Sequence, residues 1–441
     1  MKRASDLDNV STKLGRIAEL ARRAPTMAIN TLAHHIDVEL LHAAYQRTRK
    51  DGARGVDGST AADYAAHLEE NLRALLDRFK SGTYFAPPIR RVHIPKGDGS
   101  TRPIGIPTFE DKVLQRAVAM VLTAVYEQDF LDCSHGFRPG RSAHDAIDAL
   151  WRGLMGMGGG WVLEVDIRRF FDSVDHRHLR AILDQRVRDG VIRRMIDKWL
   201  KAGVLEEGTL WYPDAGTPQG GVISPLLANV YLHTVLDVWF EQEVRPRLRG
   251  RAIIVRYADD FVIGFEHERD ARRVMDVLPK RFGRYGLTLH PEKTRLVEFR
   301  RPTGDGKDPG SFDLLGFTHF WERSRNGSWV VKRKTSKTRF ARALRRVAEW
   351  CRFNLHRPMR EQHQALARKL VGHYGYFGII GNSRSLGRFK FEVQRIWRTW
   401  LLRRSSASRP RWRWQRFNEF LRRKPLPAAR VVHRLAANLT R

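Results

Sequence analysis

The sequence predicts an α/β (α+β) chain whose mixed central part is followed by an all-helical, basic C-terminal region. Between residues 84 and 322, short apolar segments with Gly and Pro at their ends alternate with stretches of helical periodicity. From residue 335 onward, apolar residues recur only at helical spacing. A chain of 441 residues is too long to fold around one ordinary hydrophobic core, so we expect about two to four domains or subdomains.

Helices are predicted over much of residues 10 to 80, where two groups of apolar residues recur at helical spacing. The loop RKDGARGVDGST, residues 49–60, separates the two groups. The first group is Leu32, Ile36, Leu40 and Leu41, and the second is Leu68, Leu72, Leu75, Leu76 and Phe79.

The central part begins with HIPKGDGSTRPIGIP, residues 93–107, which predicts a hairpin with GDGS at its tip. Further segments follow in order along the chain. We expect helices over 110–128, 142–154, 174–200 and 268–285, an apolar strand at WVLEVDI (161–167), a glycine loop leading into an apolar helix over 217–240, and extended segments at TRLVEF (294–299) and SFDLLGFTHF (311–320).

The charge of the chain indicates a polyanionic partner. Lys and Arg number 80 against 48 acidic residues, for a formal net charge of +32. No run of about 18 apolar residues, lipidation signal or secretory signal is present. This favours nucleic acid rather than a membrane surface as the partner, and it favours a cytoplasmic location. Cys133 and Cys351 lack a metal-ligand pattern, so we expect no structural zinc.

The stretch IIVRYADDFVIGF, residues 253–265, places Asp259 and Asp260 side by side between apolar residues. Burying two carboxylates is costly unless cations or hydrogen bonds meet them, and a tight turn between strands could hold both near one end of a sheet. Asp166 ends another apolar segment. Converging carboxylates suit a pair of Mg²⁺ ions about 4 Å apart. Ordinary turn chemistry for Asp259 and Asp260, and a helix N-cap for Asp166, are the alternatives.

Eight segments resemble, in their order along the chain, the motifs of the group II intron reverse transcriptase and maturase family. RYADDFVIGF is similar to the Tyr-x-Asp-Asp motif of reverse transcriptases. The similarity covers roughly residues 40 to 435 and implies a right-hand polymerase with fingers, palm and thumb. The other segments are HIPKGDGSTRPIGIP, SHGFRPGRSAHDAI, EVDIRRFFDSVDH, GTPQGGVISPLLANVYLH, HPEKTRLVEF, FDLLGF and GHYGYFG.

The resemblance implies roles for particular residues. Asp166, Asp259 and Asp260 are expected to hold two Mg²⁺ ions, with the backbone carbonyl of Ile167 as a further ligand. The residues expected to contact the incoming deoxynucleotide are Lys96 and Arg102 at the triphosphate, Phe171 beneath the sugar, Gln219 in TPQGG, and Lys293 as a proton donor to pyrophosphate. A solvated basic loop is the alternative for Lys96 and Arg102, and a helix-entry loop for Gln219.

The aromatic ring of Phe171 indicates the polymer that is made. A ring beneath the sugar leaves no room for a 2′-hydroxyl, so the resemblance implies DNA synthesis. The neighbouring Phe170 is expected to face the core.

The C-terminal third is expected to bind nucleic acid. In KTSKTRFARALRRVAEWC, arginines lie opposite an apolar helical face, a pattern that an ordinary amphipathic surface helix would also show. Residues 401–441 hold twelve Arg or Lys against one acid, Glu419, and alternate arginine with tryptophan. The expected contacts are Arg339, Arg342, Arg345, Arg346, Arg411, Arg413, Trp412 and Trp414.

The predicted organisation is a helical N-terminal extension (1–55), fingers and palm (56–322), thumb (330–400) and a basic tail (401–441). The implied activity is RNA-directed DNA polymerase, with an RNA template that includes intron RNA, a DNA primer or target, dNTPs, and maturase function. Two alternatives stay open: a domesticated enzyme of phage defence or repair, and an RNA-binding maturase with a vestigial polymerase. No Cys-pair and His endonuclease motif follows, so priming from existing 3′ ends is expected.

Overall fold

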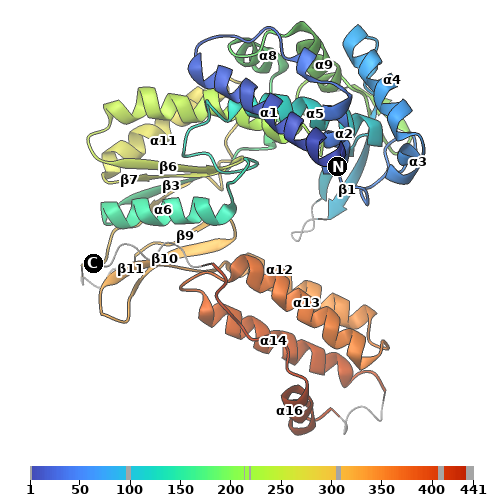
Figure 1. The fold of residues 1–441 in the computed structure, drawn as a ribbon. Coiled ribbons are helices and arrows are strands. Elements are labelled where there is room, and N and C mark those ends of the chain that lie inside the picture. Colours follow the sequence, from blue (N-terminus) through green and yellow to red (C-terminus); the bar gives the residue numbers. More distant parts are fainter. Residues whose placement is uncertain are drawn as a thin grey trace. The chain divides into compact units, whose positions relative to one another are not determined.

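The computed structural model describes residues 2–95, 101–212, 214–217, 220–303, 309–405 and 412–433, with the side chains of the first helix from Asn9 onward. The fold class is confirmed: a mixed α/β part and a helical C-terminal region (Figure 1). The chain forms two compact units that interleave in sequence. Unit 1 holds residues 1–142, 165–261 and 269–295, and unit 2 holds residues 143–164, 262–268 and 296–441.

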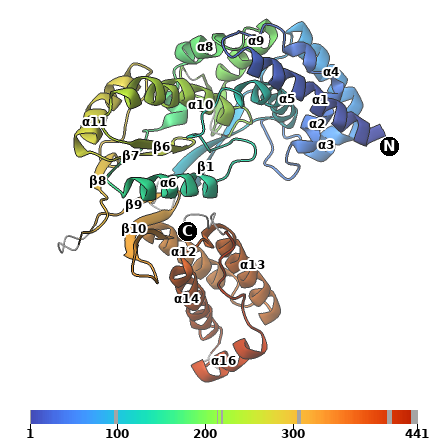
Figure 2. The ribbon, with the colours of Figure 1, turned by 60° about the vertical axis from the view of Figure 1, so that its left-hand side comes forward.

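Helix α5 (Phe109–Tyr126) is the centre of unit 1. Its side chains are buried along most of its length, because α1 (Lys2–Arg23) and α2 (Val38–Arg47) both pack on it (Figures 1 and 2). The short α3 (Ala61–Ala66) and the longer α4 (Leu68–Ser81) complete the helices predicted for this part of the chain.

Unit 1 also contains a four-stranded sheet with the order β2-β1-β4-β5. The predicted hairpin is its core: β1 (Ile89–Pro95) and β2 (Thr101–Ile106) pair antiparallel, from Arg90 opposite Ile106 to Pro95 opposite Thr101. The expected tip at GDGS lies outside the described residues. Strand β4 (Val204–Glu206) is parallel to β1 and turns back into β5 (Thr209–Trp211).

Two further helices of unit 1 begin at aspartate caps. Asp175 caps α8 (His176–Asp184), and Asp189 caps α9 (Gly190–Leu200). The predicted apolar helix begins as α10 (Ser224–Leu232) and continues as the π-helical segments η2 (His233–Val238) and η3 (Phe240–Val244). The charged helix is α11 (Glu268–Gly283).

A second four-stranded sheet has the order β6-β7-β3-β8. Its strands are β6 (Ala252–Tyr257), β7 (Asp260–Phe265), β3 (Trp161–Val165) and β8 (Arg295–Glu298). The glycines before β3 are needed for close packing: a Cβ on Gly160, which has φ +126°, would lie 2.1 Å from the carbonyl oxygen of Phe265.

Unit 2 further contains α6 (Ala143–Met157) and an antiparallel meander in the order β11-β10-β9. The meander strands are β9 (Phe312–Leu314), β10 (Phe317–Arg323) and β11 (Trp329–Thr335). Helix α6 packs on β11, where the indole Nε1 of Trp151 donates to the carbonyl of Val331 at 2.9 Å.

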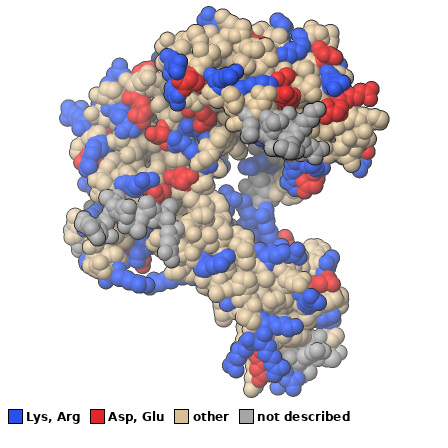
Figure 3. All heavy atoms as spheres, in the orientation of Figure 1, with Lys and Arg blue, Asp and Glu red and all other residues tan. Residues whose placement is uncertain are grey.

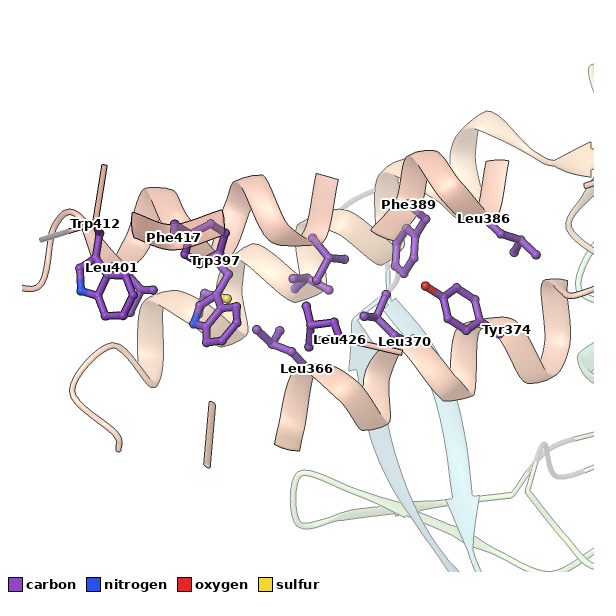
Figure 4. Packing of buried hydrophobic residues seen from close by; sticks show 13 residues of the cluster. Leu366, Leu370, Tyr374, Leu386, Phe389, Trp397, Leu401, Trp412, Phe417 and Leu426 are labelled. Carbon is purple, nitrogen blue, oxygen red and sulfur yellow. The ribbon is translucent and has the colours of Figure 1, made fainter. Parts of the chain in front are cut away.

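The C-terminal bundle consists of α12 (Lys337–Phe353), α13 (Met359–Phe377), α14 (Ser383–Leu401) and α16 (Trp414–Arg423). Its core contains large apolar side chains from all four helices and from the segment after α16 (Figure 4). Trp397 is fully buried there, and Leu426 belongs to the same cluster. Much of the predicted basic tail therefore packs as part of this bundle. Among the described helices, none combines the length and apolarity needed to cross a membrane.

Candidate active site

The sequence IIVRYADDFVIGF forms two strands joined by a two-residue turn. Strand β6 ends at Tyr257 and β7 begins at Asp260, so Ala258 and Asp259 form the turn. Ala258 has φ +58°, a left-handed conformation that is costly for a residue with a Cβ. Neighbouring groups must hold the turn in this shape.

Arg256 provides that support from the buried side of β6. Its side chain is fully buried, and its guanidinium donates to the carbonyl of Ala258 at 3.0 Å. It also donates to Asp237 Oδ1 at 2.7 Å, to Asn229 Oδ1 at 2.9 Å and to Ser134 Oγ at 2.8 Å. Burial opposes the charge, but the attraction of Asp237 outweighs it and raises the pKa of Arg256.

Sequence analysis did not single out Arg256 or its buried partner Asp237. A signal was present, because each is a charged residue inside an apolar segment: Arg256 in IIVRY and Asp237 in TVLDVWF. Buried charges are nearly always paired, so two such residues within one region indicate a pair.

A cavity of about 890 Å³ in unit 1 contains both Asp166 and Asp259 in its wall. The described lining residues are Arg91, His93, Thr101, Arg102, Pro103, Asp166, Ile167, Arg168, Arg169, Phe170, Phe171, Asp172, Val204, Trp211, Asp214, Ala215, Gly216, Thr217, Asp259, His290 and Lys293. Five predicted site residues, Asp166, Ile167, Phe171, Arg102 and Lys293, therefore share one cavity with Asp259.

The half-buried Asp259 interacts electrostatically with Asp166. Burial raises the pKa of the Asp259 carboxyl, and the negative charge of Asp166 raises it further, whereas Arg102 and Arg256 lower it. Two carboxylates that repel each other in one cavity are better stabilised by a cation than by water alone.

Asp260 occupies a different position from Asp259. It is the first residue of β7, is exposed, and does not line the cavity. Asp259 belongs to the turn and Asp260 to the strand that follows it, so the two side chains lie in different surroundings. Of the three predicted aspartates, Asp166 and Asp259 line the cavity and Asp260 does not.

The backbone around Asp166 is fixed by the segment after α11. The N–H of His290 donates to the carbonyl of Asp166 at 2.8 Å, and the N–H of Arg168 donates to the carbonyl of Thr288 at 2.8 Å. Neither bond uses the carbonyl of Ile167, which lies between them. The ammonium of Lys293 forms an ion pair with Asp166 at 3.1 Å.

Phe171 is positioned by the glycine loop that precedes α10. Its carbonyl accepts a hydrogen bond from the N–H of Thr217 at 2.7 Å, and a Cβ on Gly216 would lie 2.9 Å from the same oxygen. Phe171 is half-buried in the cavity wall, and its neighbour Phe170 is only 3% exposed, as expected. Gly220 is needed as well, since a Cβ there would lie 2.3 Å from the carbonyl of Gly105 in β2.

Three predicted contacts cannot be placed, because Lys96, Gln219 and Arg411 lie outside the described residues. Arg102, at the start of β2, is exposed and lines the cavity close enough to Asp259 to lower its pKa.

The donor set fits magnesium bound together with a substrate. The described part of the chain has no group of three or more His, Cys, Asp or Glu arranged to enclose a metal ion. Mg²⁺, however, is usually bound by one or two carboxylates, several waters and substrate phosphates. Asp166 and Asp259, which share a cavity and repel each other, provide such carboxylates.

Comparison with known proteins decides the family. Residues 94–319, half of the chain, match the family model described as reverse transcriptase (RNA-dependent DNA polymerase). The match runs from the end of β1 into β10. The chain belongs to the reverse transcriptase family. Asp166 and Asp259 lie within the matched residues, as do all the other described lining residues of their cavity except Arg91 and His93.

Similar proteins confirm the group II intron branch. Protein YkfC of Escherichia coli K12 is 36% identical over 359 residues, covering 73% of this chain and 91% of YkfC. The group II intron-encoded protein LtrA of Lactococcus lactis is 40% identical over 281 residues, covering 60% of this chain. The match covers only 46% of LtrA, so this reverse transcriptase chain spans about half the length of that relative. A putative COX1/OXI3 intron 1 protein of Saccharomyces cerevisiae is 27% identical over 316 residues, or 61% of this chain and 38% of the yeast protein.

The C-terminal bundle of the reverse transcriptase presents most of its predicted contacts to solvent. Arg339, Arg345 and Arg346 on α12 are exposed, Arg342 is half-buried, and basic side chains are spread over the visible bundle surface in Figure 3. Arg413 is exposed as well. Trp414 is 39% exposed, and the Cζ atom of Arg398 lies 4.4 Å from the centroid of its ring.

The prediction that Trp412 stacks on nucleic acid bases is wrong. Trp412 is only 9% exposed, and its ring packs edge-on against Phe417 and Phe420 in the bundle core. The alternation of arginine and tryptophan gave no indication that this ring is buried. Burial in the core stabilises the bundle more than exposure of a large aromatic ring to water.

Proposed function

We propose that this chain is an RNA-directed DNA polymerase that adds deoxynucleotides to the 3′ end of a primer. The supporting observation is that Asp166 and Asp259 line one cavity with Arg102, Phe171 and Lys293. Nucleotidyl transfer needs carboxylates for divalent ions, cations for a triphosphate and a surface for the sugar, and all three lie in this cavity.

Asp166 and Asp259 would hold Mg²⁺, with Asp260 and the carbonyl of Ile167 as further oxygen ligands. When bound, the ions would lower the pKa of the primer 3′-hydroxyl and neutralise charge on the phosphates. Arg256 and Asp237 keep the Ala258 and Asp259 turn in place before any ion binds.

The protein groups around the ions would bind and orient the nucleotide. Arg102 would bind the triphosphate, since a guanidinium can donate two parallel hydrogen bonds to phosphate oxygens, and Lys96 would assist from the same hairpin. Gln219 would contact the nucleotide from the glycine loop. Lys293, held by Asp166 at 3.1 Å, would donate a proton to the pyrophosphate that leaves.

Phe171 would select deoxynucleotides. Its backbone is fixed by Thr217, so the ring cannot retreat easily from a 2′-hydroxyl placed against it. A half-buried ring held in a packed wall excludes an added oxygen by steric overlap.

The partners we propose are an RNA template that includes intron RNA, and a DNA primer or target. The names of the LtrA and yeast COX1/OXI3 relatives refer to introns, which supports intron RNA and a maturase role in splicing. The net charge of +32 and the exposed bundle arginines suit such partners.

Primer extension on an RNA template with Mg²⁺, run with dNTPs and NTPs in parallel, tests the proposal. We expect dNTP incorporation, and we expect Asp259→Asn to reduce it by at least about 1000-fold, because loss of one electrostatic contact to the transition state costs this order. RNA affinity should stay within a few-fold. Asp276→Asn, an exposed aspartate of α11, is the matched control.

Two outcomes would overturn the proposal in different ways. RNA binding without any extension by the wild-type protein would leave a binding maturase. Loss of RNA binding together with extension in Asp259→Asn would give this residue a role in folding rather than in the reaction.

A further inference from the structure

A second cavity, of about 540 Å³, lies in unit 1 among α1, α2, α5 and the loop that follows α5. Apolar and small side chains make up much of its wall. The wall also holds Arg47, Arg116, Glu127 and Arg138, and the ring of Phe137. None of them has a place in the reaction proposed above.

Two guanidinium groups in this cavity lack a partner. Neither Arg47 nor Arg116 forms an ion pair with the residues that the structure describes, and the buried Nε of Arg116 has no hydrogen-bond partner there. Burial, and then the charge of Arg47, lower the pKa of Arg116. Glu127, the acidic residue of the wall, does not offset these two effects, because its carboxylate already accepts hydrogen bonds from Arg138 at 3.0 and 3.1 Å.

An exposed aromatic ring completes the wall. Phe137 is 54% exposed and has φ +58°, a strained backbone that a loop retains only when its surroundings require it. The preceding Gly136 explains the requirement: a Cβ there would lie 2.3 Å from the backbone N of Ala258, and its carbonyl accepts from Asn229 at 2.7 Å.

The loop that bears Phe137 is therefore fixed directly against the turn that presents Asp259. The rings of Phe137 and Tyr257 have centroids 6.5 Å apart. A nucleic acid strand at the catalytic turn would pass within reach of Phe137.

We propose that this cavity binds one nucleotide of the single-stranded template. Arg47 and Arg116 bind its phosphate, and Phe137 with the apolar wall contacts its base. The chemistry is that of single-strand binding, in which guanidinium groups bind the backbone and aromatic rings stack on bases. The assignment to the template depends on the polymerase function proposed above, because the uncopied template is the single strand in that reaction.

The size and charge of the cavity favour this occupant. A volume of about 540 Å³ admits one nucleotide and not a duplex. Two unpaired guanidinium groups beside a flat ring suit a phosphate and base better than an acidic peptide, whose carboxylates gain nothing from the ring.

Binding of labelled oligonucleotides tests the cavity independently of any reaction. The probes are single-stranded RNA, single-stranded DNA and a blunt RNA–DNA duplex, measured by fluorescence anisotropy. We expect Arg47→Met with Arg116→Met to weaken single-strand binding about 10-fold, and to reduce the slope of log affinity against log salt by about 0.7 to 1.4. Blunt duplex binding should change less than twofold.

Three further variants control for structure and for the ring. Arg73→Met removes an exposed arginine of α4 that is outside the cavity and should leave all three probes unaffected. Phe137→Ala should weaken single-strand binding about 5- to 10-fold, and Phe137→Tyr should restore it, because stacking needs the ring and not its exact substituent. Melting temperatures of the variants should match the wild type, since the substituted arginines have no ion pair to lose.

Primer extension then distinguishes the template from other strands. On templates with a long 5′ overhang, the arginine double variant should raise the template KM about 10-fold at unchanged kcat, whereas a one-nucleotide overhang should show no difference. Unchanged single-strand binding, equal loss on the blunt duplex, or competition by polyglutamate but not by RNA would overturn the inference. If the wild type extended no primer while single-strand binding still depended on both arginines, the polymerase proposal would fail and the cavity would remain a single-strand site.

Discussion

The turn that bears Asp259 in unit 1 and the C-terminal bundle in unit 2 use arginine in opposite ways. Arg256 is fully buried, and its guanidinium is matched by four partner groups that hold Ala258 and Asp259. On α12, the arginines are mostly exposed, and the helix is held by an apolar core that includes Val347 and Cys351. Position is therefore essential for the buried arginine at the turn. At the bundle, we expect the proposed binding of nucleic acid to depend on the total charge more than on any single arginine.

The energetic reason for this difference is desolvation. A buried guanidinium has lost its water, so every donor left without an acceptor costs free energy. An exposed guanidinium keeps its water and can exchange one partner for another at little cost.

The largest effect on stability is expected from breaking the buried pair at the turn. Arg256→Met leaves Asp237 buried without its partner and should lower the free energy of unfolding by about 3–5 kcal/mol, measured by urea denaturation of the full chain. Arg284→Met, at an exposed position after α11, should change it by less than about 0.5 kcal/mol.

A double variant sharpens the test of the pair. Arg256→Met with Asp237→Leu removes both charges and should recover much of the lost stability, while the unsupported turn keeps primer extension low. If the single Arg256→Met variant were as stable as wild type and fully active, the turn would not depend on this pair.

The sequence predicted the hairpin, most of the helices and several cavity residues, but not the contacts that support the turn. The hairpin of β1 and β2, the helices, and the sharing of one cavity by Asp166 and Asp259 followed from periodicity and from motif order. The pairing of Arg256 with Asp237 and Ser134 could not be derived in this way, because it joins segments 19 and 122 residues apart.

The error over Trp412 has a physical cause. Local pattern shows which residues are charged or aromatic, but not which side of an element meets the core. Trp412 was expected at the surface and is buried, whereas the expected role of Asp260, which begins β7 and is exposed, stays a prediction. Tertiary packing decides where Trp412 lies.

A buried histidine gives the bundle a dependence on pH. His373 of α13 is 8% exposed and stacks on Phe389 with centroids 3.7 Å apart. Burial lowers the pKa of His373 to about 4, below its ordinary 6.5, so the folded state disfavours the proton that the unfolded chain accepts. The stability is present above pH 6.5 and is lost as the pH falls toward 4.

His373→Phe should remove this part of the pH dependence. Between pH 7.5 and 4.5, the wild type should lose about 2–3 kcal/mol more unfolding free energy than the variant, measured by urea denaturation at both values. His356→Phe, at an exposed position, is the matched control. Equal pH dependence in wild type and His373→Phe would mean that the ring takes up its proton without loss of packing.

Substitution of Phe171 tests whether the position of its ring determines the selection of deoxynucleotides over ribonucleotides. Phe171→Val shortens the side chain beside the expected sugar position, so ribonucleotides should be accepted about 10- to 100-fold better relative to deoxynucleotides. The measurement is kcat/KM for dNTP and NTP in primer extension. Phe85→Ala, which truncates a ring that is 75% exposed, should change neither value. Unchanged sugar discrimination in Phe171→Val would remove Phe171 from this role.

The smallest effects are expected from single arginine substitutions on the bundle. They test whether the bundle binds nucleic acid by its total charge rather than by the position of one arginine. Replacing Arg339, Arg342 or Arg346 singly by Gln should weaken binding to an RNA–DNA duplex by only a few-fold, and each should reduce the salt slope by about 0.7 to 0.9. The triple variant should show the sum, with kcat unchanged at saturating template. Arg16→Gln on α1 is the control outside the bundle. If one bundle arginine alone caused a loss of more than about 10-fold, its guanidinium would require a fixed partner, as Arg256 does, and the bundle would bind by position rather than by total charge.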